Sequence, residues 1–171
     1  MTNMNYRFDG HAFVFGDNID TDAIIQTDFL SVSDEQILAA HCMERISPGF
    51  HMRVSKGDIL VAGENFGCGS SREQAPISIK GCGIACVVAK SFSRLFYRNA
   101  INIGLPVIDA DIPAISDGEE LSVDCVTGVI RIAKSGAEVS GAPLPEFMLE
   151  ILRAGGLTGY LEQRLKARSS K

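Results

Sequence analysis

A glycine-rich run with two serines and an arginine is the part of this sequence whose residue types could do chemistry. The run reads GENFGCGSSRE over residues 63–73, and three of its first seven residues are glycine. Glycine permits positive φ angles and close approach of the backbone to a ligand. The run follows a strand-like segment and precedes a helix-like one beginning near Glu73. Ser70, Ser71 and Arg72 would therefore lie at a helix start, where free N–H groups favour an anion.

This pattern predicts a site for a carboxylate or a phosphate. The alternative is an ordinary helix cap, because Ser or Asn shortly before Glu is also a common start signal.

The remaining polar residues do not predict a metal site. The number of cysteines is odd and their spacing fits no zinc or disulfide framework, so free thiols in a reducing cytosol are expected. The histidines are far apart in the chain and are expected to be structural or exposed. The acidic segment at residues 17–22 superficially resembles a calcium loop, but it lacks the central glycine and terminal Glu of an EF-hand. Asx turns explain such a segment more simply.

Composition bounds the class of protein. The chain has 171 residues, of which 46% are hydrophobic and 22% charged, as expected for one soluble globular domain over residues 1–171. A net charge of −5 argues against a nucleic-acid partner but not against a small anionic substrate. No apolar stretch approaches the ~20 residues that span a bilayer, and the N-terminus does not resemble a signal peptide. A cytoplasmic protein without a membrane partner is expected, with a disordered tail at residues 166–171.

The elements around the glycine-rich run predict an α/β fold. Strands are expected at residues 58–62, 84–89 and 105–108, with helices at 74–80 and after Ser91 or Ser93. This strand–helix–strand–helix–strand order indicates parallel pairing.

The flanking segments add further elements to this core. An additional strand is expected at residues 11–15, and a capping box of Ser33 and Gln36 should open a helix to about His41. Residues 120–125 and 129–133 alternate around Thr127-Gly128, which predicts a β-hairpin. Helices at 146–153 and 157–166 follow, the last of them amphipathic.

Three segments together carry a family resemblance. They are GDNIDTD at residues 16–22, GENFGCGSSREQAP at 63–76, and AKSFSRLFYRNAINIGLP at 89–106. The combination resembles the small subunit of isopropylmalate dehydratase, which is the swivel domain of the aconitase superfamily. The resemblance covers about residues 11–110 and implies a single swivelling three-layer β/β/α domain.

The resemblance also implies an activity. Family members reversibly dehydrate and rehydrate hydroxy di- or tricarboxylic acids, and a [4Fe-4S] cluster on a separate large subunit acts as a Lewis acid. This chain would thus bind no cofactor, and it would be active only with the cluster-bearing large subunit, in a cytoplasmic heterodimer. Isopropylmalate in leucine biosynthesis is the leading substrate. Related substrates are those of homoaconitase, dimethylmalate dehydratase and maleate/malate-type enzymes.

Site roles follow from the matched motif. Ser70 matches the catalytic base, acting as an alkoxide on the carbon next to a carboxylate, while Ser71 and Arg72 match the binders of the substrate carboxylate. A serine is a poor base in water and needs cationic and N–H surroundings that stabilise the oxyanion. An adjacent arginine can orient a carboxylate through two parallel hydrogen bonds.

The sequence departs from the family pattern in two places. Gln74 stands where most members have His. The segment Gln26-Thr27-Asp28-Phe29-Leu30 stands where many have Pro-Ala-Arg-Tyr-Leu, which is the family's substrate-recognition loop. Asp28 reverses the local charge and would repel a carboxylate, so either this loop points elsewhere or the substrate differs.

Other classes of function and other residue roles stay open at this point. A non-catalytic anion-binding module would tolerate these departures, although the intact Ser-Ser-Arg argues against it. A nucleotide-binding domain is disfavoured because the run lacks Lys-Ser/Thr and Gly-x-Gly-x-x-Gly. Arg94, Tyr97 and Arg98 could face the partner subunit or form a solvated helix face with core aromatics. Asp20 and Asp22 could support the active site or simply build turns.

Overall fold

The computed structural model describes residues 6–169, which form a mixed sheet of seven strands with the order β4-β3-β2-β1-β5-β6-β7. Strand β1 (Arg7–Val14) lies at its centre and divides a parallel half from an antiparallel half. The parallel half contains β2 (Ile59–Ala62), β3 (Cys86–Ala89) and β4 (Val107–Asp109). The antiparallel half contains β5 (Glu120–Asp124), β6 (Val129–Ile132) and β7 (Glu138–Ser140).

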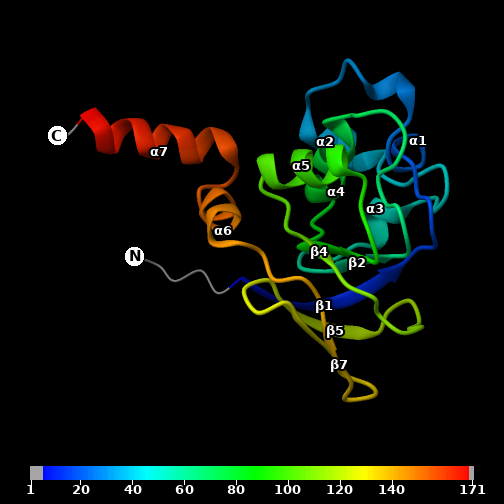
Figure 1. Cartoon of the computed structure of the whole chain (residues 1–171). Helices are drawn as coiled ribbons and strands as arrows, with labels where there is room; N and C mark the ends of the chain where they lie inside the picture. Colours follow the sequence, from blue (N-terminus) through cyan, green and yellow to red (C-terminus); the bar gives the residue numbers. More distant parts are fainter. Residues whose placement is uncertain (1–5, 170–171) are drawn as a thin grey trace.

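The two halves differ in burial because only one of them is covered on both faces. Every residue of β2 and β3 is buried, as is typical of parallel strands. In β5, Leu121 and Val123 are buried while their neighbours are not, the alternation of a sheet with one face in water. In Figure 1 the helices cover the parallel half, and the antiparallel half lies on the opposite side. The predicted α/β class, with a β/β/α layering, is confirmed.

Five short helices form the covering layer, joined by a 3-10 turn. The helices are α1 (Thr21–Ile24), α2 (Glu35–Ala40), α3 (Phe50–Arg53), α4 (Gln74–Gly81) and α5 (Arg94–Asn102), and the 3-10 turn is η1 (Thr27–Phe29). Sequence reasoning found α2, α4 and α5 and missed the other three, which are only three or four residues long. Helix α3 nevertheless contributes Phe50, which is fully buried and packs edge-to-face on Phe13 at 5.1 Å between ring centroids.

One predicted cap is wrong. Helix α2 begins after Asp34, whose carboxylate accepts hydrogen bonds from the backbone N–H of Gln36 at 2.8 Å and of Ile37 at 3.2 Å. Ser33 was the expected cap, but Asp34 is one residue closer and an Asp caps as well as a Ser.

The C-terminal part consists of α6 (Glu146–Arg153) and α7 (Leu157–Ser169). Helix α7 extends away from the sheet (Figure 1), contacts α6 and α5, and has no fully buried residue, so the apolar face predicted for it is not enclosed by residues 6–169. The expected disordered tail at 166–171 is helical as far as Ser169, and its last two residues lie outside the described range. No helix within residues 6–169 has the length and apolar character needed to cross a membrane.

Candidate functional site

The acidic segment at residues 16–22 runs alongside the glycine-rich run and supports it. Backbone hydrogen bonds join Gly67 N to Ile19 O at 2.7 Å and Thr21 N to Cys68 O at 3.0 Å. Asp20, which forms a bridge with Cys68, also caps α1 by accepting from Ala23 N at 2.7 Å. Asp20 therefore builds the turn that was considered for it, and it also contacts the glycine-rich run through the bridge to Cys68.

Gly67 is required by the close packing of the run on α5. It has φ +75°, and a Cβ at this position would lie 2.3 Å from Phe96 Cγ. A side chain would thus be strained in its backbone conformation and would overlap the ring. The run and α5 consequently form one packed unit, with the Phe66 and Phe96 rings 5.1 Å apart.

The two serines and the arginine are each held by one residue from a distant part of the chain. Thr21 Oγ1 donates to Ser70 O at 3.0 Å. Asn99 Nδ2 donates to Ser71 Oγ at 3.2 Å. Arg72 Nη1 forms an ion pair with the Asp22 carboxylate. Ser70 and Ser71 are exposed, whereas the Arg72 side chain is only 10% exposed, so the guanidinium is fixed while both serines stay accessible.

The serines do not cap α4. That helix begins at Gln74 after Glu73, and no side chain hydrogen-bonds its N-terminus. Within residues 6–169 the Ser70 hydroxyl has no hydrogen-bond partner, so it is available for another role. This finding removes the ordinary cap as the explanation for the Ser-Ser-Arg sequence.

The segment at residues 26–30 lies next to the site. Gln74 Nε2 donates to Leu30 O at 2.7 Å, so the departure at position 74 ties this segment to the start of α4. Phe29 stacks on His41 with ring centroids 4.1 Å apart. A cavity of about 370 Å³ is lined by Asp22, Gln26, Thr27, Asp28 and Arg45. Asp28 therefore shares its cavity with a guanidinium, Arg45, which no local sequence signal had singled out.

The polar residues singled out on α5 divide into two kinds. Tyr97 packs edge-to-face on Phe92 at 5.9 Å, and its hydroxyl contacts Met148 Sδ at 3.7 Å. Burial raises the pKa of Tyr97 to about 12, so the phenol stays neutral and serves packing. Arg94 and Arg98 are exposed and form no ion pair within the described part of the chain.

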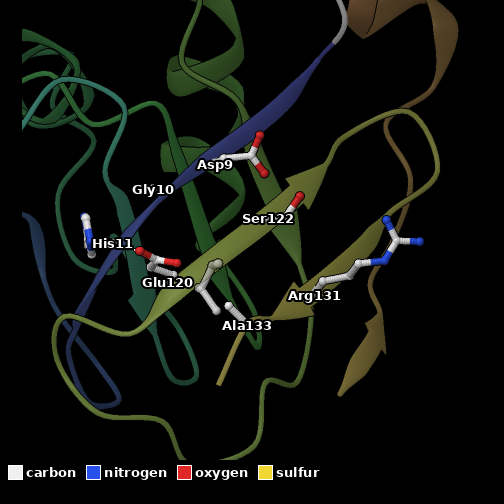
Figure 2. Close-up of a pocket in the computed structure, with 8 residues that line it drawn as sticks. Asp9, Gly10, His11, Glu120, Ser122, Arg131 and Ala133 are labelled. Atoms are coloured by element: carbon white, nitrogen blue, oxygen red, sulfur yellow. Dashed lines mark ion pairs between the residues drawn. The ribbon is translucent and has the colours of Figure 1, made fainter. Parts of the chain in front are cut away.

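A larger cavity, of about 450 Å³, lies on the outer face of β1, β5 and β6 (Figure 2). His11 approaches Asp58 at 3.5 Å through Nδ1 and Glu120 at 3.7 Å through Nε2. Arg131 pairs with Glu138 at 2.6 Å. Because these polar groups already contact one another on a solvated sheet face, we assign the candidate site to the glycine-rich run.

Metal ligation is not supported by the donor set. Within residues 6–169 no group of three or more His, Cys, Asp or Glu side chains could hold a metal ion. All five cysteines are free thiols, and burial raises the pKa of Cys42 and Cys86, which disfavours the thiolate that a metal requires. The residues of this chain thus do not fit an iron–sulfur cluster.

Thr21→Val tests the support of Ser70. Thr21 is 3% exposed, and Val keeps its shape but leaves the Ser70 carbonyl without its hydroxyl donor. We expect the free energy of unfolding to fall by about 1–2 kcal/mol, measured by urea denaturation. The same change at exposed Thr158 on α7 is the control and should stay within about 0.5 kcal/mol of the parent chain. Equal stability of the two variants would contradict this role.

Comparisons with known proteins place the site in a family context. The model of the family "Aconitase C-terminal domain" matches residues 46–111, which include the whole glycine-rich run. A 3-isopropylmalate dehydratase small subunit of Caldicellulosiruptor bescii is 53% identical, over 93% of this chain and 97% of the relative. A 2,3-dimethylmalate dehydratase small subunit of Eubacterium barkeri is also 53% identical, over 89% of this chain and 94% of the relative.

A solved structure is similar over the same length. The crystal structure of a 3-isopropylmalate dehydratase from Methanocaldococcus jannaschii superposes with a TM-score of 0.91 at 48% identity, covering 96% of this chain and 98% of that chain. This chain and its relatives are therefore similar in fold and in sequence over nearly its whole length, a range that includes the glycine-rich run.

Proposed function

The chain belongs to the family of 3-isopropylmalate dehydratase small subunits, and on this premise we propose that it is the small subunit of a hydro-lyase that interconverts 3-isopropylmalate and 2-isopropylmalate in leucine biosynthesis. One observation carries the proposal: two exposed serines beside a nearly buried arginine, with each of the three residues held from elsewhere in the chain, on a fold shared with these relatives.

In this proposal Ser70 removes the proton from the carbon next to a substrate carboxylate. Its hydroxyl is exposed and forms no hydrogen bond within residues 6–169, so no residue in that range competes for it. In water such a hydroxyl is far too weak an acid to supply an alkoxide at neutral pH. A partner must therefore exclude solvent and add donors around the oxyanion, which makes the isolated chain inactive.

Ser71 and Arg72 bind the substrate carboxylate. Asp22 pairs with Nη1 of Arg72 and fixes the guanidinium, which has five N–H donors and so keeps others for the substrate. Fixing the substrate carboxylate also fixes the neighbouring substrate carbon relative to Ser70, which precedes Arg72 by two residues. Binding of the carboxylate therefore also orients the substrate proton that Ser70 removes.

The partner in this proposal is a large subunit that carries a [4Fe-4S] cluster. The cysteines of this chain do not form a ligand set, so the cluster is assigned to the partner. When bound there, it would supply Lewis-acid chemistry at the substrate hydroxyl. The residues of this chain would bind the carboxylate, orient the substrate and move the proton.

A second candidate substrate is 2,3-dimethylmalate. The Eubacterium barkeri relative named for that activity is as similar, at 53% identity, as the one named for isopropylmalate. Both substrates are hydroxy-diacids and use the same three site residues.

The test is reconstitution with the large subunit of the same organism. Both chains are co-expressed anaerobically, the cluster is reconstituted, and a panel of hydroxy-diacids is followed by absorbance of the unsaturated product. We expect turnover only from the complex, with the highest kcat/KM for 3-isopropylmalate. A complex with an intact cluster that converts none of the diacids would overturn the proposal, and a preference for 2,3-dimethylmalate would select the second substrate.

A further inference from the structure

We propose that Asn99 is a positioning residue that orients the hydroxyl of Ser71, so that its proton faces the substrate carboxylate. The inference rests on the proposed function and adds a residue that the Ser-Ser-Arg motif does not contain. Asn99 lies 28 positions from Ser71 in sequence and reaches it only through the packing of α5 against the glycine-rich run.

The contact between the two side chains has a defined direction. Asn99 is 9% exposed, and its Nδ2 donates to Ser71 Oγ at 3.2 Å. Water cannot easily replace this bond, because Asn99 is buried on α5. Its loss would leave an amide donor unsatisfied, so the bond should persist when substrate binds.

The direction of the Asn99–Ser71 hydrogen bond determines whether Ser71 can donate a proton to a ligand. A serine hydroxyl has one donor and two acceptor positions. Asn99 occupies an acceptor position, so the hydroxyl proton is not directed at Asn99 and remains free to donate. An ionised carboxylate only accepts, and it requires a donor from each group that binds it. Ser71 held in this way therefore complements Arg72, whose guanidinium also only donates.

The distance between Asn99 and Ser71 is fixed by contacts of the run with residues 91–96, which lead into and begin α5. Ser93 N donates to Phe66 O at 2.9 Å, and Phe66 N donates to Ser91 O at 3.0 Å, which joins the run to the segment before α5. Phe96 then fills the space above Gly67 that a Cβ would need. Such a rigid support holds a binding group in its productive geometry before the ligand arrives.

Asn99→Asp reverses the direction of the bond at nearly constant shape. The introduced carboxylate can only accept, so the Ser71 proton turns toward it and a lone pair faces the substrate. In the reconstituted complex we expect KM for the preferred hydroxy-diacid to rise about tenfold or more, with kcat within about threefold of wild type. Asn102→Asp on the same helix is the matched control, because the Asn102 side chain makes no hydrogen bond to the run within residues 6–169, and its KM should not change.

A second variant and a double-mutant cycle separate positioning from a merely structural role. Asn99→Ala removes the bond without adding a charge and should raise KM less than Asn99→Asp, by about three- to tenfold. If Asn99 acts through Ser71, adding Asn99→Ala to Ser71→Ala should change KM no further. A structural role would instead give additive effects on KM that follow the loss of thermal stability.

The outcomes distinguish this inference from the proposed function. A wild-type complex that converts no hydroxy-diacid would overturn the proposed function. An active wild-type complex combined with an unchanged KM in both Asn99 variants, or with additive effects in the cycle, would overturn the role of Asn99 alone. A raised KM in both variants, with a cycle that is not additive, would support it.

Discussion

Ser70→Ala in the assembled enzyme is expected to lower kcat by about 10²–10⁴-fold, the range that a positioned general base contributes. The reason is the loss of the hydroxyl that takes the proton from the carbon next to the carboxylate. KM should change by no more than a few-fold, because Ser71 and Arg72 still bind the carboxylate. Steady-state kinetics on the complex with 3-isopropylmalate measures both quantities.

The fold should tolerate this substitution, which makes the kinetic result easy to interpret. The Ser70 hydroxyl makes no hydrogen bond within residues 6–169, and its backbone carbonyl would still accept from Thr21 Oγ1. Thermal unfolding of the variant should match that of the parent chain. Ser140→Ala, at an exposed position on β7 far from the run, controls for loss of a serine in general. Wild-type turnover of Ser70→Ala would show that another group is the base.

The regular elements could be predicted from sequence because their signals are local. The continuous apolar run that ends at Ala89 is β3, and the hairpin around Thr127-Gly128 is β5 and β6. Helix α4 begins at Gln74 and keeps Pro76 in its first turn, where proline is tolerated. Helix α3 escaped notice because four residues cannot display a helical period, although its Phe50 is a core residue.

Only part of the candidate site could be predicted from the sequence, because local patterns identify the motif but not the residues that support it. The Ser-Ser-Arg sequence is contiguous, so motif and chemistry together identify it. Its supports are long-range: Thr21 and Asp22 lie about fifty residues earlier in the chain, and Asn99 lies on a helix after the next strand. No local sequence pattern indicates that these side chains contact the Ser-Ser-Arg motif. Asp22 had been a candidate, but Asn99 and Arg45 had not.

The supports also bear on how the departures from the family pattern should be understood. Gln74 has a structural role of its own, because its amide donates a hydrogen bond to Leu30 O and so anchors the segment that contains Asp28. Asp28 in turn lines a cavity with Arg45 rather than standing alone as a negative charge. The segment that carries the charge reversal at Asp28 thus lines the same cavity as a guanidinium from a different segment.

Arg72→Lys is expected to raise KM in the complex by about 10–100-fold, with a smaller effect on kcat. The guanidinium can hold Asp22 with one edge and the substrate carboxylate with its remaining donors. A lysine is a single point charge, and in this position Asp22 would compete for it directly. Losing a charged hydrogen bond of about 1.5–3 kcal/mol corresponds to that range of affinity.

A matched control at another arginine makes the Arg72 result specific. Arg94→Lys makes the same chemical change on α5, at an exposed residue with no ion pair within the described part of the chain, and should leave KM within about twofold. Asp22→Asn should act in the same direction as Arg72→Lys but more weakly, because it frees the guanidinium without removing it. An unchanged KM in Arg72→Lys would mean that the substrate carboxylate is bound elsewhere. The fixed Asp22–Arg72 pair would then be a purely structural link between the acidic segment and the glycine-rich run.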